Sequence, residues 1–146
     1  MGKLRLLDGA GILTLILAAL HLGCIIFGAE WYRILGAGEQ MAQLAERGDP
    51  YPTIITSTII FLLLIWSCYA FSGAGRFFKL PLLRTGLSLI AIVLLTRALG
   101  FYFLTSAFPD NSLTFWLISS GLCFILGSVY ALGLKQSWQY LSKQSQ

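Results

Sequence analysis

One stretch of the chain decides its fold class, and over residues 53–72 it reads TIITSTIIFLLLIWSCYAFS. It contains no charged side chain, and its length is what an α-helix needs to cross a bilayer. Three more apolar runs of similar length lie at 10–29, 82–104 and 113–133. Only helices satisfy all their backbone groups within one such segment. The sequence therefore predicts an all-α membrane protein, a four-transmembrane-helix bundle in a single domain over residues 1–146.

The composition agrees with lipid as the solvent. Hydrophobic residues make up 57% of the chain and charged residues only 11%, whereas soluble domains carry about 25% charged residues. The first run is longer than the 7–15 apolar residues of a typical signal peptide, so we expect it to be retained as a span. Little chain is left outside the four runs for a soluble domain.

The distribution of Lys and Arg predicts the orientation. Seven of them lie at the two ends of the chain and around the second connection, at positions 3, 5, 76, 79, 84, 135 and 143. Only Arg33 and Arg47 lie in the first connection, and the third has none. The positive-inside rule then predicts that both termini lie in the cytoplasm. Because topology explains the net charge of +4, we expect membrane lipids and no nucleic acid as partners.

The first connection is the only sizeable loop. Within it, Glu39–Arg47 is predicted to form a short helix that ends at Gly48, with apolar residues on one side. Two interpretations stay open for this outer helix. It lies in the headgroup layer, or it forms a lid over the mouth of the bundle. The turn at 48–52 should lead into the second span, and Asn111 or Ser112 should cap the fourth.

Polar residues inside the runs fall at one depth. His21 and Arg97 lie ~12 Å and ~10 Å along a helix from the outer ends of the first and third runs. Thr56 and Ser120 lie in the outer halves of the second and fourth. Polar groups that faced lipid at this depth would be unsatisfied. We therefore expect all four to face the bundle interior and to form an outward-facing binding layer.

Arg97 admits two interpretations, since a charged residue near mid-membrane costs about 2.5–3.5 kcal/mol on insertion scales. Either it extends outward to lipid phosphates or to Glu30 or Glu39, or it lines a cavity with His21 and binds an anionic or polar ligand. His21 alone is either a satisfied interior histidine or a ligand-contacting, proton-carrying one. Only Cys24 shares its face, so neither a metal site nor any cofactor is expected.

A ridge of small residues repeats every four positions on the fourth run, at Ser119, Cys123, Gly127 and Ala131. Such a ridge lets helices approach closely. It predicts packing within the bundle or a homo-oligomer formed through this face.

Several small four-helix membrane families lack support in the sequence. Small multidrug transporters need a carboxylate in the first helix, where this chain has His21. Vitamin K epoxide reductase-type enzymes need a Cys-x-x-Cys pair, and diheme cytochromes of the b561 type need several histidines. Glutathione-linked membrane enzymes of the eicosanoid class carry Arg and Asn in the second helix, and this one has neither.

The chain resembles a group of small four-span bacterial membrane proteins of unknown function. The resemblance rests on His21, Arg97 and the motifs at 36–39, 69–75 and 80–84, and it extends over about residues 10–104. It implies a multi-pass protein of the bacterial inner (plasma) membrane and no particular activity. In overall plan the chain is also similar to the DoxX-like four-helix membrane proteins, without a shared motif.

Two functional hypotheses follow from these features. In the first, the protein binds a small anionic molecule or a lipid headgroup through His21, Arg97, Thr56 and Ser120, with Glu30 and Glu39 nearby, on its own or as a transport component. In the second, it is a non-catalytic interaction protein, an accessory subunit or an immunity protein, that uses the small-residue ridge and the acidic outer loop. An enzyme is less favoured, because no nucleophile or carboxylate accompanies His21 and Arg97.

Overall fold

The computed structural model describes residues 5–76, 78–107, 109 and 111–143, of which 85% are helical and none lies in a strand. In chain order the helices are α1 (Arg5–Phe27), α2 (Ala29–Ile34), α3 (Glu39–Glu46), α4 (Pro50–Gly73), α5 (Leu83–Leu99), α6 (Phe101–Ala107) and α7 (Leu113–Lys143). The predicted all-helical class is confirmed.

Three helices, α1, α4 and α7, are long and apolar enough to cross a membrane. The bent pair of α5 and α6 makes a fourth span if it is counted as one. Only 22–33% of the most apolar window of each of the three long helices is buried inside the molecule. Most of their apolar surface therefore faces outward, which is consistent with a helical bundle surrounded by lipid.

The third apolar run differs from the prediction of one straight span over 82–104. Helix α5 ends before Gly100, and α6 continues at 67° to it. A Cβ atom on Gly100 would lie 2.8 Å from the carbonyl oxygen of Thr96, so glycine permits the bend. The single helix predicted over 82–104 is thus corrected to a pair of helices that meet at a sharp bend. Because α6 leans over, Arg97 lies closer to this end of the bundle than the ~10 Å counted along a straight helix.

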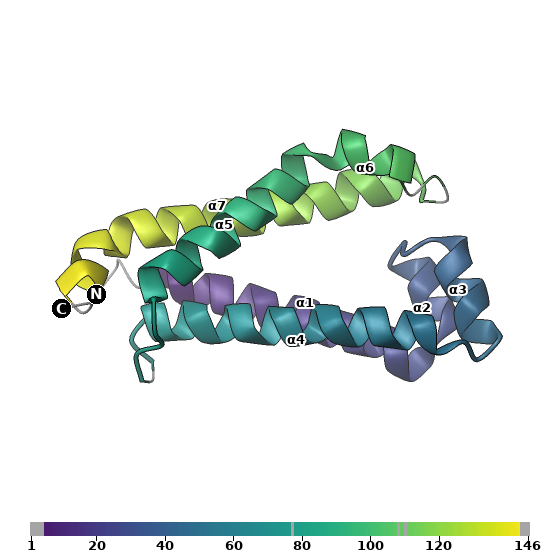
Figure 1. Ribbon diagram of the computed structural model, residues 1–146, viewed down its shortest axis with the longest axis horizontal. Helices are drawn as coiled ribbons and strands as arrows, with labels where there is room; N and C mark the ends of the chain where they lie inside the picture. The colour runs from purple at the N-terminus through teal and green to yellow at the C-terminus, as the bar shows by residue number, and fades with distance from the viewer. Residues whose placement is uncertain (1–4, 77, 108, 110, 144–146) are drawn as a thin grey trace.

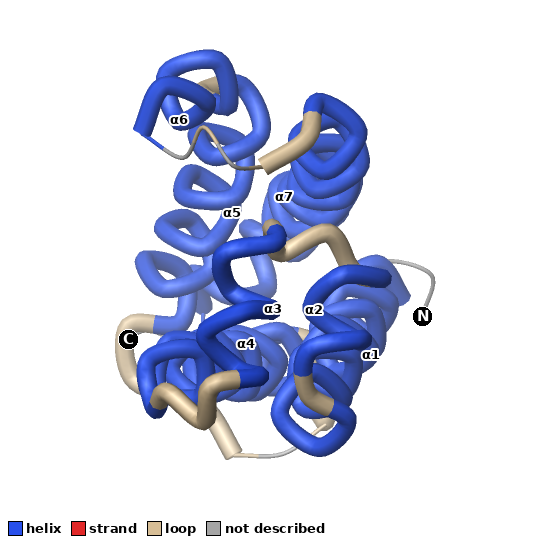
Figure 2. The backbone as a smooth tube through the Cα atoms, turned by 90° about the vertical axis from the view of Figure 1, so that its right-hand side faces the viewer, coloured by secondary structure: helices blue, strands red, loops and turns tan. Residues whose placement is uncertain are grey.

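The long helices form two antiparallel pairs, α1 with α4 and α5 with α7 (Figure 1). The pairs touch at the end where α1 begins and α7 ends, and they diverge toward the end that carries α2, α3 and α6. Seen from that end, the pairs lie as two separate layers (Figure 2). The connections therefore alternate between the two ends of the bundle, as the predicted topology requires.

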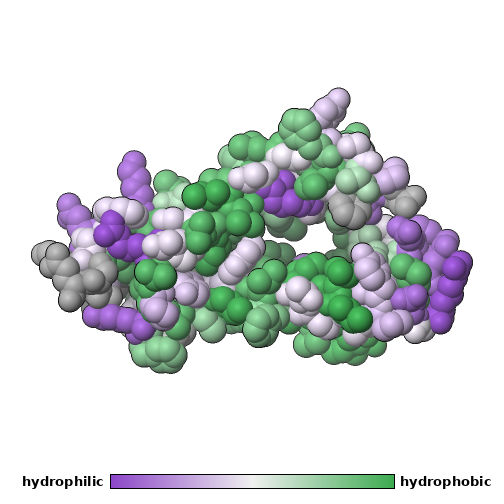
Figure 3. Space-filling model, viewed as in Figure 1, coloured by the Kyte–Doolittle hydropathy of each residue, from purple (hydrophilic) through white to green (hydrophobic). Residues whose placement is uncertain are grey.

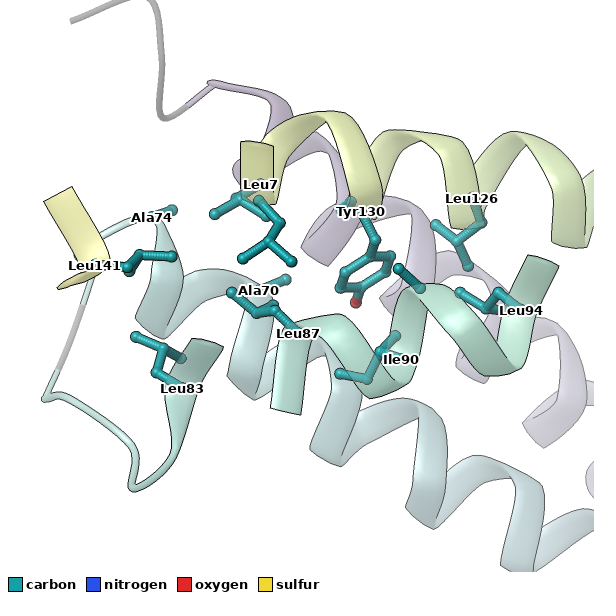
Figure 4. Close-up of a cluster of buried hydrophobic side chains, with 13 residues drawn as sticks. Leu7, Ala70, Ala74, Leu83, Leu87, Ile90, Leu94, Leu126, Tyr130 and Leu141 are labelled. Atoms are coloured by element: carbon teal, nitrogen blue, oxygen red, sulfur yellow. The ribbon is translucent and has the colours of Figure 1, made fainter. Parts of the chain in front are cut away.

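A buried cluster around Tyr130 of α7 joins the two pairs (Figure 4). The Tyr130 side chain has no exposed surface, and its hydroxyl donates to the carbonyl oxygen of Trp66 on α4 at 3.0 Å. The same hydroxyl lies 3.0 Å from the hydroxyl of Thr14 on α1. Nearer the termini, a Cβ on Gly133 would lie 2.8 Å from the side chain of Leu7. Helices α1 and α7 therefore pack closely from the termini as far as Thr14.

Helices α2 and α3 pack on the far ends of α1 and α4. Tyr32 and Ala42 are buried there in one cluster with Cys24. The short helix predicted at Glu39–Arg47 is confirmed as α3, and Gly48 follows it with a φ of 71°. Gly36, in the turn between α2 and α3, also lies against the ring of Phe115 on α7. These two helices therefore span the open end of the bundle.

Two of the predicted helix starts are confirmed by their caps. The Ser112 hydroxyl accepts a hydrogen bond from the backbone N–H of Phe115 at 3.1 Å, so Ser112 rather than Asn111 caps α7. The Asp49 carboxylate accepts from the N–H of Tyr51 at 2.8 Å at the start of α4. Each bond satisfies one of the free N–H groups of a first helical turn.

Candidate functional site

Arg97 of α5 is held against α7 by three side chains. One Nη donates to the hydroxyl of Ser119 at 3.1 Å and the other to the hydroxyl of Ser120 at 3.3 Å. The guanidinium carbon lies 5.0 Å from the ring centroid of Trp116, within the range of a cation–π contact. The half-buried cation is thus fixed in position, and its packing partners are hydroxyl groups and a ring face.

The charge of Arg97 has no balancing carboxylate in the described part of the chain. The ion pairs there involve Arg33 and Arg76, and none involves Arg97. A guanidinium has five N–H donors, and the two serine hydroxyls accept two of them. Three donors and a full positive charge are therefore available to an acceptor that the described residues do not supply.

Trp116 adds an unused donor at the same place. Its side chain is only 3% exposed, and its indole N–H is buried without a hydrogen-bond acceptor among the described residues. The hydroxyls of Ser119 and Ser120 also donate to no described group while they accept from Arg97. An indole N–H only donates, and a guanidinium only donates. The complementary ligand is therefore rich in acceptors, and beside an unpaired cation that means an anion.

The two helix pairs leave an opening between them near this cluster. The contact of Thr14 with Tyr130 closes it on one side, and the contact of Gly36 with Phe115 closes it at the α2–α3 end. Figure 3 shows this opening through the molecule, with hydrophilic surface on its α5 border and apolar surface elsewhere around it. Because both ends are closed, the opening is reached from the side, between the two helix pairs.

His21 lies on the α1 side of the opening. It is two helical turns beyond Thr14, and a separation of seven residues returns to nearly the same helix face. Thr14 contacts α7, so the helix face that carries Thr14 and His21 is directed toward α7. At the level of His21 the two helix pairs have diverged, and α7 lies farther away. The Nδ1–H of His21 donates to the carbonyl of Leu17 at 2.7 Å. Nε2 forms no hydrogen bond with a described residue.

The other predicted site residues lie elsewhere. The hydroxyl of Thr56 is 2.9 Å from the hydroxyl of Tyr32, so it ties α4 to α2 in a buried position. Glu30 and Glu39 bind Arg33, at 3.1 Å and 2.8 Å. The structure therefore brings Ser120 to Arg97 and places none of Thr56, Glu30 or Glu39 in contact with it.

Arg33 also pairs with Glu46 at 2.7 Å, so a single guanidinium joins α2 to both ends of α3. Its hydrogen bonds hold the pKa of the Glu39 carboxyl below the usual range. These groups are exposed, and the network positions the two helices that cover the open end of the bundle.

Acid should loosen this network. A carboxyl with a lowered folded-state pKa contributes stability that is present above its ordinary pKa and is lost as the pH falls through the lowered value. We expect the hydrogen-exchange protection of the α3 amides, corrected for intrinsic rates, to fall as the pH drops below about 4. Glu39→Gln should show weaker protection at neutral pH and little further change in acid. Protection of wild-type α3 that persists to about pH 3 would contradict this role.

The small-residue ridge of α7 faces its own chain at Gly127. A Cβ atom on Gly127 would lie 3.0 Å from Leu94 and from Leu95 of α5. Ser119, two turns away on the same ridge, binds Arg97. At these positions the close approach that the ridge permits is therefore made between α5 and α7. A second copy would have to approach α7 from another side or displace α5.

Trp116 and Tyr130 were not among the candidates from sequence. Trp116 lies near the end of an apolar run, where aromatic residues commonly mark the membrane interface. Trp116 lies three residues before Ser119 and four before Ser120, and residues at these spacings share one helix face. This spacing was the feature of the sequence that could have identified Trp116 as part of the site. The part of the chain that the structure describes holds no group of three or more His, Cys, Asp or Glu able to bind a metal.

Comparison with known proteins assigns no family to this chain. Neither the protein-family models, nor the curated proteins, nor the solved structures include a match to it. The resemblance to small four-span bacterial membrane proteins stays a prediction from motifs, and function has to be inferred from the residues of this chain.

Proposed function

We propose that this chain is a multi-pass membrane protein that binds an anionic group at Arg97. The anionic group is either a small free anion, with phosphate as the model, or the phosphate of a lipid headgroup. The site consists of Arg97, Ser119, Ser120 and Trp116, with His21 across the opening. The proposal applies equally to a binding protein and to the binding subunit of a transporter, since both need this site.

One observation carries the proposal. The unpaired guanidinium of Arg97 and the unpartnered, buried indole N–H of Trp116 lie together, and both can only donate hydrogen bonds. Burying a polar group without a partner costs free energy, commonly about 1–3 kcal/mol in proteins. An anion with several oxygen atoms neutralises the charge of Arg97, and it reaches the indole N–H once the side chains that cover this atom move aside.

The proposed orientation places this site on the outer side of a bacterial inner membrane, with both termini in the cytoplasm. The end that carries α2 and α3 holds the acidic residues Glu30, Glu39 and Glu46. The second connection lies at the opposite end, and α1 begins and α7 ends there. By sequence, seven Lys or Arg lie in or around the second connection and the two ends of the chain, against two in the first connection. The positive-inside rule then assigns the Arg97 end to the outside.

The interaction hypothesis has less support from the geometry. It depends on the acidic outer loop and on the small-residue ridge as free surfaces. Glu30, Glu39 and Glu46 are all bound by Arg33. Gly127 on the ridge is covered by α5. Neither surface carries an unsatisfied group comparable with the donors around Arg97, so we favour binding of an anion.

Calorimetry on the detergent-purified protein tests the proposal with two probes, inorganic phosphate and dodecyl phosphate. We expect saturable binding, and the tighter probe indicates whether the anion is free or carried by a lipid. The double variant Ser119→Ala/Ser120→Ala should bind about tenfold more weakly, since it removes two hydrogen bonds that orient the guanidinium. Ser128→Ala on the same helix is the matched control and should bind as wild type does. Saturable binding of neither probe to the wild type would refute the proposed site.

A further inference from the structure

A second feature of the bundle lies away from the Arg97 cluster, at the end where the chain begins and ends. A groove of about 950 Å³ runs between α5 and α7 on their outer surface. Its inner half is apolar and includes Ala91, Leu95 and Leu132. The half nearest the termini is polar and includes Lys135, Gln136 and Gln139. The groove thus has the polarity of a lipid, apolar at one end and basic at the other.

Arg84 is not itself a lining residue, but it lies beside two residues that line the groove. It is one helical turn before Ser88, which lines the groove and donates its hydroxyl hydrogen to the Arg84 carbonyl at 2.8 Å. The Arg84 guanidinium carbon stacks 3.7 Å from the ring centroid of Trp138, another lining residue. The Nε–H of Arg84 is buried without an acceptor in the described part of the chain. Neither Arg84 nor Lys135 forms an ion pair with a described carboxylate.

The position of Lys135 along α7 matches the depth of a lipid headgroup layer. Lys135 is 22 residues from the start of α7 at Leu113, or ~33 Å along the helix. The hydrocarbon core of a bilayer is ~30 Å thick. If α7 crosses the membrane from Leu113, Lys135 therefore reaches the phosphates of the leaflet at the termini, and Ala91 and Leu132 lie beside the acyl chains.

We propose that this groove is a specific site for one anionic phospholipid of the leaflet at the basic end of the bundle. The phosphate accepts hydrogen bonds from the terminal N–H groups of the Arg84 guanidinium and from the Lys135 ammonium. One acyl chain lies along Ala91, Leu95 and Leu132. Two cations without a neighbouring described carboxylate leave a net positive charge, which favours anionic over zwitterionic headgroups. This site is independent of the proposed function, since it shares no residue with the Arg97 cluster and lies at the other end.

Native mass spectrometry of the detergent-solubilised protein, with equal amounts of phosphatidylglycerol and phosphatidylcholine added, tests the site. We expect the wild type to retain one phosphatidylglycerol in preference to phosphatidylcholine. Lys135→Gln should weaken this retention about fivefold, and Arg84→Gln/Lys135→Gln more than tenfold, from the contribution of a basic residue at a membrane surface. Lys135 is exposed, so its substitution should leave folding intact. Lys79→Gln removes an exposed charge near the same end and should change nothing.

Arg97→Leu separates this site from the proposed function, because phosphatidylglycerol retention should persist in that variant. Equal retention of both lipids by the wild type, or unchanged retention in the Arg84→Gln/Lys135→Gln variant, would overturn the proposal. So would loss of the lipid in Arg97→Leu alone, since the lipid would then occupy the other site. A dimer that binds no phosphatidylglycerol would mean that a second copy covers the groove instead.

Discussion

Tyr130→Ala should separate the two helix pairs and lower the free energy of unfolding by about 3–5 kcal/mol, the usual cost of truncating a buried aromatic side chain to alanine. The Tyr130 ring is fully buried where α1, α4, α5 and α7 meet. Away from the Tyr130 cluster and the turn at Gly36, the pairs diverge (Figure 1). A cavity at this joint therefore removes much of the contact that holds one pair to the other.

The hydroxyl of Tyr130 contributes less than its ring. It donates to the carbonyl of Trp66 and lies 3.0 Å from the Thr14 hydroxyl, which itself lies 2.7 Å from the carbonyl of Ala10. The Tyr130 and Thr14 hydroxyls have one hydrogen each, but together they make three contacts. Only two of the three contacts can therefore be hydrogen bonds at one time. Interhelical hydrogen bonds in membranes contribute about 0.6 kcal/mol on average and at most about 1.7. Tyr130→Phe should therefore cost about that much.

Equilibrium unfolding in mixed micelles of a mild detergent and dodecyl sulfate measures both effects. Tyr140→Ala is the matched control, because Tyr140 lies on the same helix with 47% of its side chain exposed. It should cost less than about 1 kcal/mol. If Tyr130→Ala costs no more than Tyr140→Ala, the joint does not depend on Tyr130. Equal losses in the Phe and Ala variants would mean that the hydroxyl contacts, and not ring packing, hold the pairs together.

The sequence was sufficient for the helices and insufficient for their arrangement. Length and apolar content predict α1, α4 and α7, because a run without charges has few alternatives to a helix in lipid. Local rules also predict the turn at 48–52, a cap at Asn111 or Ser112 and the short helix α3. The bend at Gly100 was not predicted, because a single glycine inside an apolar run is compatible with a straight helix. The grouping into two pairs depends on packing between faces that are all apolar.

The candidate site was predictable in part for a related reason. The depth that two residues share in the membrane is one coordinate of their positions. From this coordinate the sequence placed Ser120 near Arg97, and the two side chains are in contact. Depth does not give the direction in which a side chain points. Thr56 was predicted at the same depth as Arg97, but its hydroxyl contacts Tyr32. Glu30 forms an ion pair with Arg33, three residues further along the same helix. Trp116 was missed because its indole N–H matters only once its burial is known.

Arg97→Leu should weaken the binding of the phosphate probes about a hundredfold. A hydrogen bond to a charged group contributes about 1.5–3 kcal/mol, and a phosphate can accept at least two from the free N–H groups of one guanidinium. Arg97→Lys should recover part of this affinity, because it keeps the positive charge. The recovery should be incomplete, because lysine lacks the planar guanidinium that also binds Ser119 and Ser120. Arg47→Leu, an exposed arginine at the same end, is the control and should leave binding unchanged.

The indole N–H of Trp116 gives a second, smaller test of the same contact. Trp116→Phe keeps a ring beneath the guanidinium and removes the donor. It should weaken binding about three- to tenfold if the N–H reaches the anion, and it should leave affinity unchanged if the ring only supports Arg97.

The stability of Arg97→Leu distinguishes a binding site from a cation that only extends toward the headgroups. Removing a half-buried charge from lipid depth should in either case favour insertion. At a binding site, added phosphate raises the melting temperature of the wild type, because a ligand that binds only the folded state stabilises it, and this increase should vanish in Arg97→Leu. If the variant melts higher and wild type and variant respond equally to phosphate, Arg97 is a positioning charge between α5 and α7 and the proposed function is wrong.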